Sequence, residues 1–242
     1  MVGSFCLLCH LGFKRQLISR DQRTVLIIKL LQEQVVDQRK KLAYWRDLTK
    51  QPSQIDTGYI SQYLLSLITS IYGGLMRGKG TDLDDGSEIK AANFLDSLDK
   101  KGATAPRWNL SSNNLKTMES FLSFPALYLV SMDLNPAGKF RTRVWKLDPN
   151  KHILFRKRYL EWMEKLGKVK LGDPGRPGIN FQLFPPHNKT DESFARHGNG
   201  RTNGFSPIKI ELEGVQGAKK ILHAEENNGV IEVIYLDSNI TV

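Results

Sequence analysis

The stretch that decides the fold is Gly80-Thr81-Asp82-Leu83-Asp84-Asp85-Gly86-Ser87-Glu88-Ile89-Lys90. It is typical of a tight β-hairpin in which Asp84-Asp85-Gly86 forms a type I turn followed by a left-handed glycine. In that register Asp82 lies across the ladder from Glu88, and Lys90 shares their face because side chains alternate along a strand. Asp, Glu and Lys on one surface can bind a hard divalent cation and orient a water molecule beside it.

This cluster depends on the length of the loop. If Asp85-Gly86 alone formed a two-residue loop, Asp82 would point to the opposite face and the charged groups would not meet. A Glu-x-Lys pair on the exposed face of a strand is also common, and by itself it indicates only solvation. The neighbouring segments therefore have to decide between a chemical site and a solvated hairpin.

The spacing of apolar residues predicts regular elements on both sides of the hairpin. A dense apolar run over 126–132 has the length of a central buried strand, and residues 140–146 alternate as an amphipathic strand with a basic face. Trp108 and Trp145 are expected in the core. Four helices are expected: one over about 19–50, one that begins at an Asp56 or Thr57 N-cap and ends at Gly73-Gly74, one near 115–122, and one from 148 to about 166. Short strands are expected over 180–183, 207–212 and 230–236.

This order of elements predicts an α/β fold of mixed type, with a central mixed β-sheet flanked by helices. We expect three segments: an N-terminal helical extension over 1–52, suited to dimerisation, a core over 53–170, and a C-terminal β-rich segment over 171–242. The last of these is expected to pack on the core and to take part in recognition. The 242 residues are enough to bury a substantial core.

The composition favours a polyanionic partner. Lys and Arg number 35 against 25 Asp and Glu, a net charge of +10, and nucleic acid is the commonest partner of such a surplus. Charge alone does not distinguish a nucleic-acid-binding protein from a basic protein whose charge only aids solubility. Apolar runs are interrupted well short of a membrane span, and the first residues lack a secretory signal. We therefore expect an intracellular, cytoplasmic protein that does not contact membranes.

The two cysteines lie in Cys6-Leu7-Leu8-Cys9-His10, which has the spacing of a c-type haem attachment site. That chemistry requires export, which nothing in the preceding residues would direct, so we expect no haem. A structural zinc site normally needs four ligands, and the sequence contains neither a second cysteine pair nor histidines at paired metal spacing.

In its context, the motif resembles the core of the PD-(D/E)xK nucleases: Asp82, five residues, then Glu88-Ile89-Lys90, with a helix before and a buried strand after. The resemblance covers about 57–166. Thr81 stands where the motif has proline, a departure that many family members share. The segment Asp82–Asn93, together with Pro106-Arg107-Trp108-Asn109, resembles type II restriction endonucleases of the MamI kind. The resemblance implies a restriction-endonuclease-like core.

The resemblance also implies a role for each residue of the motif. Asp82 and Glu88, with the backbone carbonyl of Ile89, would ligate Mg²⁺, for which Mn²⁺ would substitute. Lys90 would contact the scissile phosphate and orient or help to deprotonate the attacking water. Without the metal, one of two clustered carboxylates is expected to have a raised pKa, because like charges repel.

Family members often carry Glu or Gln on the preceding helix as an outer ligand. Gln62 or Asp56 is the candidate here, and an exposed helix glutamine with no such role is nearly as good an interpretation of Gln62.

DNA contacts are expected from basic and amide side chains. The residues just upstream of the hairpin would steer the phosphate backbone, a basic stripe on 140–146 would contact phosphates, and the polar tract 196–203 would read base edges from a mobile loop. That tract is equally typical of a surface loop with no such role. The expected DNA-binding residues are Arg77, Lys79, Asn93, Arg107, Arg141, Arg143, Lys146, Arg196, His197, Asn199, Arg201 and Asn203.

The leading hypothesis is a Mg²⁺-dependent type II restriction endonuclease, a hydrolase that cuts double-stranded DNA at a specific sequence. A homodimer is expected because two-fold symmetric sites favour two-fold symmetric proteins. Two alternatives remain: a repair nuclease with the same core that nicks one strand as a monomer, and a basic nucleic-acid-binding protein without catalysis. In the latter, Asp82, Glu88 and Lys90 would be surface charges.

Overall fold

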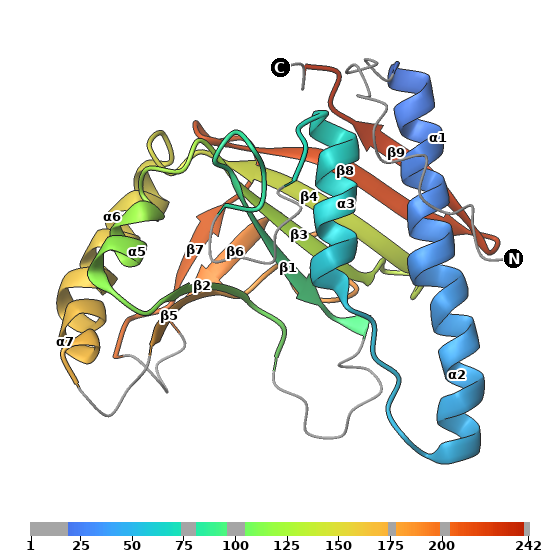
Figure 1. The fold of residues 1–242 in the computed structure, drawn as a ribbon, viewed down its shortest axis with the longest axis horizontal. Helices are drawn as coiled ribbons and strands as arrows, with labels where there is room; N and C mark the ends of the chain where they lie inside the picture. The colour runs from blue at the N-terminus through green and yellow to red at the C-terminus, as the bar shows by residue number, and fades with distance from the viewer. Residues whose placement is uncertain (1–18, 74–80, 96–104, 174–177, 199–203, 240–242) are drawn as a thin grey trace, which may run out of the picture.

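A computed structural model describes residues 19–73, 81–95, 105–173, 178–198 and 204–239, and all structural features below belong to these residues (Figure 1). The centre is a five-stranded sheet with the order β1-β3-β4-β8-β9. Strand β1 pairs in parallel with β3 and the other neighbours are antiparallel, so the expected mixed sheet is confirmed. The strands are β1 (Glu88–Asn93), β3 (Leu127–Leu134), β4 (Phe140–Leu147), β8 (Ala218–Asn227) and β9 (Val230–Leu236).

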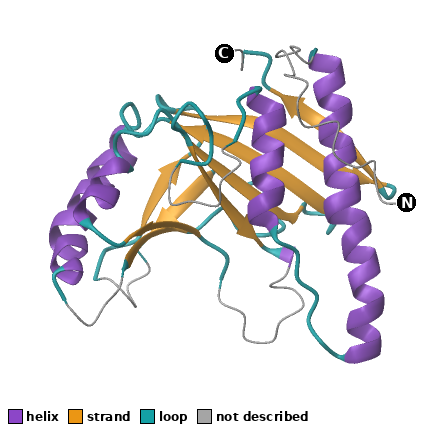
Figure 2. Cartoon of the chain, in the orientation of Figure 1, coloured by secondary structure: helices purple, strands orange, loops and turns teal. Residues whose placement is uncertain are grey.

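Two long helical segments cover one face of this sheet (Figure 2). The first runs without a break through α1 (Arg20–Leu31), the π-helical η1 (Gln32–Asp37) and α2 (Gln38–Thr49). Its start is fixed by a capping box, in which Ser19 and Gln22 each accept a hydrogen bond from the other's backbone N–H. The second is α3 (Thr57–Thr69), capped by Asp56. Both helices were expected from the sequence.

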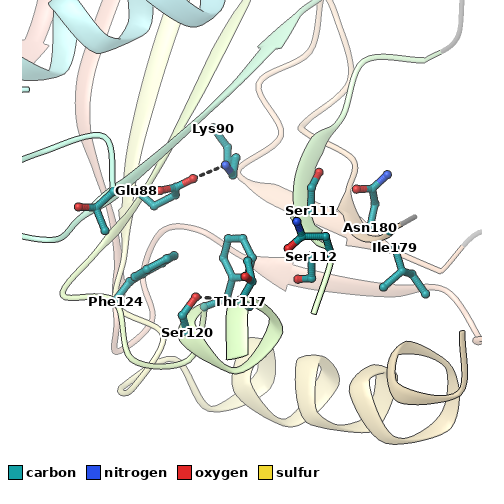
Figure 3. A pocket seen from close by; sticks show the side chains of 13 residues that line it. Glu88, Lys90, Ser111, Ser112, Thr117, Ser120, Phe124, Ile179 and Asn180 are labelled. Carbon is teal, nitrogen blue, oxygen red and sulfur yellow. Dashed lines mark hydrogen bonds and ion pairs between the residues drawn. The ribbon is translucent and has the colours of Figure 1, made fainter. Parts of the chain in front are cut away.

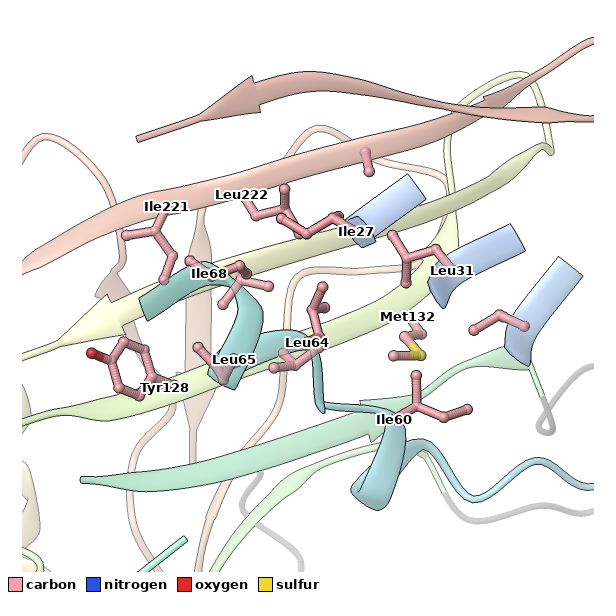
Figure 4. Close-up of a cluster of buried hydrophobic side chains, with 14 of the residues drawn as sticks. Ile27, Leu31, Ile60, Leu64, Leu65, Ile68, Tyr128, Met132, Ile221 and Leu222 are labelled. Carbon is pink, nitrogen blue, oxygen red and sulfur yellow. The ribbon is translucent and has the colours of Figure 1, made fainter. Parts of the chain in front are cut away.

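A first hydrophobic cluster fills the space between these helices and the sheet (Figure 4). Ile27 and Leu31 of α1, Leu64 of α3, Val130 of β3 and Leu222 of β8 are all fully buried in it. The N-terminal helix and the C-terminal strands therefore share the core of the central segment. The segment boundaries at 52 and 170 stay a prediction.

The opposite face of the sheet carries shorter elements. A second cluster there contains Trp108 and Trp145, both fully buried as expected, with Tyr159 and Phe181. Among the described residues, no helix has the length and hydrophobicity to cross a membrane. The elements of this side are α5 (Leu115–Ser120), α6 (Ile153–Trp162), η2 (Met163–Gly167), α7 (Lys168–Leu171), and the paired strands β2 (Trp108–Ser112) with β5 (Ile179–Leu183) and β6 (Phe194–His197) with β7 (Ile208–Glu211).

Strand β4 forms where it was expected, but its predicted basic face is wrong. The strand lies between β3 and β8 and is buried on both faces, so Arg141 and Arg143 are 0 % and 3 % exposed. Both guanidinium groups pair with the buried Asp133, with Arg141 Nε at 3.0 Å from Oδ1 and Arg143 Nη2 at 2.6 Å from Oδ2. The alternating arginines thus form an internal ion-pair cluster, and the surface stripe expected to contact DNA does not exist.

The tract 196–203 also differs from the expected loop in its described part. Arg196 and His197 end strand β6, and Arg196 pairs with Glu192 at 2.7 Å. His197 is fully buried, and its ring stacks on Phe181 with centroids 4.2 Å apart. A fully buried imidazole cannot reach a base edge, so its assignment as a DNA contact is wrong. The other predicted residues of this tract, Asn199, Arg201 and Asn203, lie outside the described residues.

The buried imidazole predicts a pH-dependent stability. Burial, with the charge of Arg158, lowers the pKa of His197 from 6.5 to about 4. Between these two pH values the imidazole is protonated in the unfolded chain but stays neutral in the folded chain. The free energy of unfolding is therefore highest above pH 6.5 and decreases by about 3 kcal/mol as the pH falls toward 4. In His197→Phe this loss should disappear, as measured by urea unfolding at a series of pH values. An unchanged acid dependence in the variant would contradict this account.

Candidate active site

The loop over 82–87 turns as the sequence predicts. Gly86 has a φ of +87°, and its N–H donates to the Leu83 carbonyl at 3.0 Å. The Leu83 N–H donates to the Ser87 carbonyl at 3.2 Å. The hairpin ladder expected beyond this turn is wrong, however. Leu83 bridges to Gly73, and β1 pairs from Glu88 onward with β3. The physical reason is that the fully buried β3 offers a partner along the whole length of β1.

Asp82 joins three segments at the free edge of β1. Its carboxylate accepts hydrogen bonds from the Ile89 backbone N–H and from Gln62 Nε2 on α3, both at 2.8 Å. Gln62 therefore lies at the site. The other candidate, Asp56, instead accepts from the N–H groups of Gly58 and Tyr59 as the cap of α3.

The backbone of β1 brings a further oxygen to this edge. The N–H of Glu88 donates to the Ala126 carbonyl just before β3, the N–H of Phe94 donates to Met132 of β3, and backbone groups in a strand alternate in direction. The N–H and C=O of Ile89 therefore face away from β3, toward Asp82. The Ile89 side chain is buried in the first cluster, so this residue offers only its backbone.

Glu88 and Lys90 point to the opposite side from Ile89, into a cleft (Figure 3). Glu88 Oε1 accepts a hydrogen bond from Lys90 Nζ, and the two side chains are only 11 % and 20 % exposed. Burial raises the pKa of Glu88, Lys90 opposes the shift, and the charge of Asp82 raises the pKa further. The direction of the pKa shift is the expected one, but burial rather than repulsion between the carboxylates is its largest cause.

The cleft has a volume of about 770 Å³ and two chemically different walls. Glu88 and Lys90 form the charged wall, and Phe121 and Phe124 contribute aromatic surface. The facing wall carries no charged side chain: besides Gly178 and Ile179, it consists of uncharged polar residues from β2, the turn after it, α5 and β5. They are Ser111, Ser112, Asn113, Thr117, Ser120 and Asn180. These wall residues were missed from the sequence, where the alternation within 108–112 and 179–183 was the available signal.

The residues at this edge fit a hard cation with an incomplete protein shell. Among the described residues, no group of three or more His, Cys, Asp or Glu side chains forms a metal cage. Mg²⁺, however, usually takes one or two carboxylates and completes its shell with water and phosphate oxygens. Glu88 Oε2 is buried without a hydrogen-bond partner, an unmet acceptor that a cation would satisfy. Asp82, Glu88 and the Ile89 carbonyl could hold such an ion.

The remaining predicted DNA contacts have internal partners or lie outside the described residues. Arg107 Nη1 donates to Gln182 at 2.8 Å, and the guanidinium lies over the Phe184 ring. Asn93 donates to the Ile55 carbonyl at 3.2 Å and so ties the end of β1 to the segment before α3. Lys146 is half-buried on β4. Arg77 and Lys79 lie outside the described residues.

Comparison with known proteins identifies the family of the chain. The family model for the MamI restriction endonuclease matches residues 44–224, so the chain belongs to that family. Type II restriction enzyme MamI of Microbacterium ammoniaphilum is 30 % identical over 191 residues, which cover 72 % of this chain and 58 % of the relative. The chain thus spans little more than half the length of that relative. No solved structure matches the chain.

Glu88 should limit the stability of the metal-free protein. Because burial raises the pKa of Glu88, its contribution to the stability of the fold is complete below pH 4.5. This contribution is lost as the pH rises through the pKa that Glu88 has in the folded protein. Glu88→Gln cannot ionise but keeps an acceptor for Lys90. With a chelator at pH 8, the variant should melt a few degrees above the wild type, since ~1 kcal/mol shifts the midpoint by roughly 2–4 °C. The difference should vanish near pH 4.

The same melting experiment with added Mg²⁺ gives the control. The wild type should be stabilised by the ion through mass action, and Glu88→Gln should gain much less. A variant that melts below the metal-free wild type at pH 8 would contradict the proposed cost of burying the charged carboxylate.

Proposed function

We propose that the protein is a metal-dependent type II restriction endonuclease that hydrolyses phosphodiester bonds at a specific sequence of double-stranded DNA. The observation that carries the proposal is that Glu88 and Lys90 line an open cleft, while Asp82 is fastened to the intervening residue Ile89 and is close enough for its charge to act on Glu88. Membership of the MamI restriction endonuclease family and a net charge of +10 support DNA as the substrate.

The proposed roles follow from the position of each group. Asp82, Glu88 and the Ile89 carbonyl hold Mg²⁺, for which Mn²⁺ substitutes. When bound, the ion supplies Lewis-acid stabilisation of the charge on the phosphoryl oxygens and lowers the pKa of a water molecule. Gln62 donates to Asp82 and fixes the direction of its carboxylate.

Lys90 acts directly on the reacting phosphate. Its ammonium group lies in the cleft beside Glu88, where low exposure strengthens its attraction for an anion. It contacts the scissile phosphate, stabilises the negative charge that grows there and orients the attacking water. The Lys90–Glu88 hydrogen bond holds the cation in position before DNA arrives.

We propose a homodimer acting in the prokaryotic cytoplasm, because a two-fold symmetric DNA site is matched by a two-fold symmetric protein. The exposed face of α2 supports this assembly. Tyr44, Trp45 and Leu48 are 65 %, 57 % and 63 % exposed there, and neighbouring apolar side chains on one helix mark an interaction surface.

Lys90→Ala should abolish cleavage of a plasmid in the presence of Mg²⁺, with a loss of about 10²–10³-fold or more in rate, because the group that stabilises the developing charge is gone. Binding of the same plasmid in Ca²⁺ should change only a few-fold. Lys139→Ala, at an exposed position in the turn between β3 and β4, is the matched control and should cut normally.

The products distinguish the candidate functions. Discrete linear bands from the wild type support restriction, nicked circles support the repair nuclease, and a gel shift without cutting supports the non-catalytic binder. Full activity of Lys90→Ala, or of the wild type in excess chelator, would contradict the proposed mechanism.

A further inference from the structure

The antiparallel ribbon formed by β2 and β5 has two chemically distinct faces. Trp108, Leu110, Phe181 and Leu183 are fully buried and pack in the second hydrophobic cluster. The alternate residues, which point away from that cluster, are Asn109 and Ser111 on β2 and Asn180 and Gln182 on β5. This second set, here called the amide face, contains no charged residue and no large apolar one.

The register of the ribbon makes the amide face a compact array. Ser111 pairs with Asn180, and Asn109 pairs with Gln182. Directly paired side chains in an antiparallel ribbon lie on the same face, about 5 Å apart, so the four polar groups adjoin one another. Ser111 and Asn180 are exposed, whereas Asn109 and Gln182 are half-buried.

The hydrogen-bonding capacity of this face is incompletely used. Asn109 Oδ1 is buried without a partner, and no hydrogen bond of the Asn180 side chain is found among the described residues. The one inward contact joins Gln182 Oε1 to Arg107 Nη1 at 2.8 Å. The Asn109 oxygen is enclosed and cannot itself meet a base edge, so the groups that this face offers to an external partner are the exposed side chains of Ser111 and Asn180.

The amide face is continuous with the proposed active site. Ser111 and Asn180 line the same cleft as Glu88 and Lys90, with Asn180 and its neighbour Ile179 projecting to opposite sides of the ribbon (Figure 3). A duplex whose scissile phosphate reaches Lys90 therefore brings the adjoining base pairs to the ribbon.

Building on the proposed nuclease function, we propose that the amide face of the β2–β5 ribbon reads base edges in the major groove beside the cut site. The major groove admits a two-stranded β-ribbon, and five residue pairs span roughly 17 Å. Asn and Gln make bidentate pairs with adenine, and Ser accepts from or donates to several bases. Uncharged contacts of this kind specify sequence, whereas phosphate attraction positions the duplex.

The test uses the full-length protein and a phage genome of known sequence, whose cut ends are mapped by sequencing. In Asn180→Ala the cleavage rate at the wild-type site, relative to sites with one changed base pair, should fall about tenfold at one position of the sequence. The slope of log affinity against log salt should match that of the wild type, because no charge is lost.

Asn180→Asp and Ser111→Ala provide second variants, and Gln51→Ala, an exposed amide on the loop before α3, is the matched control. Asn180→Asp keeps the shape but loses the donors, so it should relax the same position as Asn180→Ala. Folding of each variant is checked by its melting temperature.

Two results would overturn the inference and they differ from each other. If the wild type cuts at a defined sequence and the Asn180 and Ser111 variants keep that preference within twofold, the ribbon does not read bases and the nuclease function stands. If the wild type cuts no DNA with Mg²⁺ or Mn²⁺, the proposed function fails and base reading fails with it.

Discussion

The hydrogen bond from the Ile89 backbone N–H to Asp82 is the interaction on which the site depends. Strand β1 is the edge of the sheet, and an edge strand leaves every second N–H without a partner. Asp82 satisfies one of them and so fastens the loop over 82–87 to the strand. Gln62 holds the other carboxylate oxygen from α3, so the site is clamped between a helix and a strand. Rigid elements of this kind position catalytic groups more closely than loops do.

The alternation of β1 then separates packing from chemistry. Ile89 packs into the first cluster, while Glu88 and Lys90 on either side of it face the cleft. The consequence is a carboxylate with a raised pKa and an unpaired buried oxygen, a local cost that a bound cation would remove. A cation bound at Glu88 would therefore also stabilise the fold.

Charge is distributed differently from what the composition indicates. Arg141 and Arg143 form ion pairs with the buried Asp133 inside the sheet. The wall of the cleft that faces Lys90 carries no charged side chain. The described cleft thus combines the Glu88–Lys90 pair with hydroxyl and amide groups. Such a lining suits close contact with a duplex better than long-range attraction, which the surplus of positive charge elsewhere can supply.

Local signals in the sequence predict local structure well. The Asp-Asp-Gly turn, the cap and stripe of α3 and the apolar run of β3 all form as expected. The parallel pairing of β1 with β3 was missed, because a short motif does not indicate which strand, distant in the sequence, will pair with it. Arginines alternating at 141 and 143 look the same whether they face water or a buried Asp133. Strand β8 was also missed, because its lysines and glutamates are as typical of a solvated helix as of a strand, although β8 lies inside the sheet between β4 and β9.

The proposed mechanism requires a divalent cation, which the carboxylates of Asp82 and Glu88 and the Ile89 carbonyl would hold. The most direct measurement is the anomalous difference map of a crystal soaked in Mn²⁺. We expect one strong peak within bonding distance of both carboxylates and of that carbonyl, and no such peak in crystals of Asp82→Asn. A wild-type map with no peak there, or with its peak at other residues, would contradict the account.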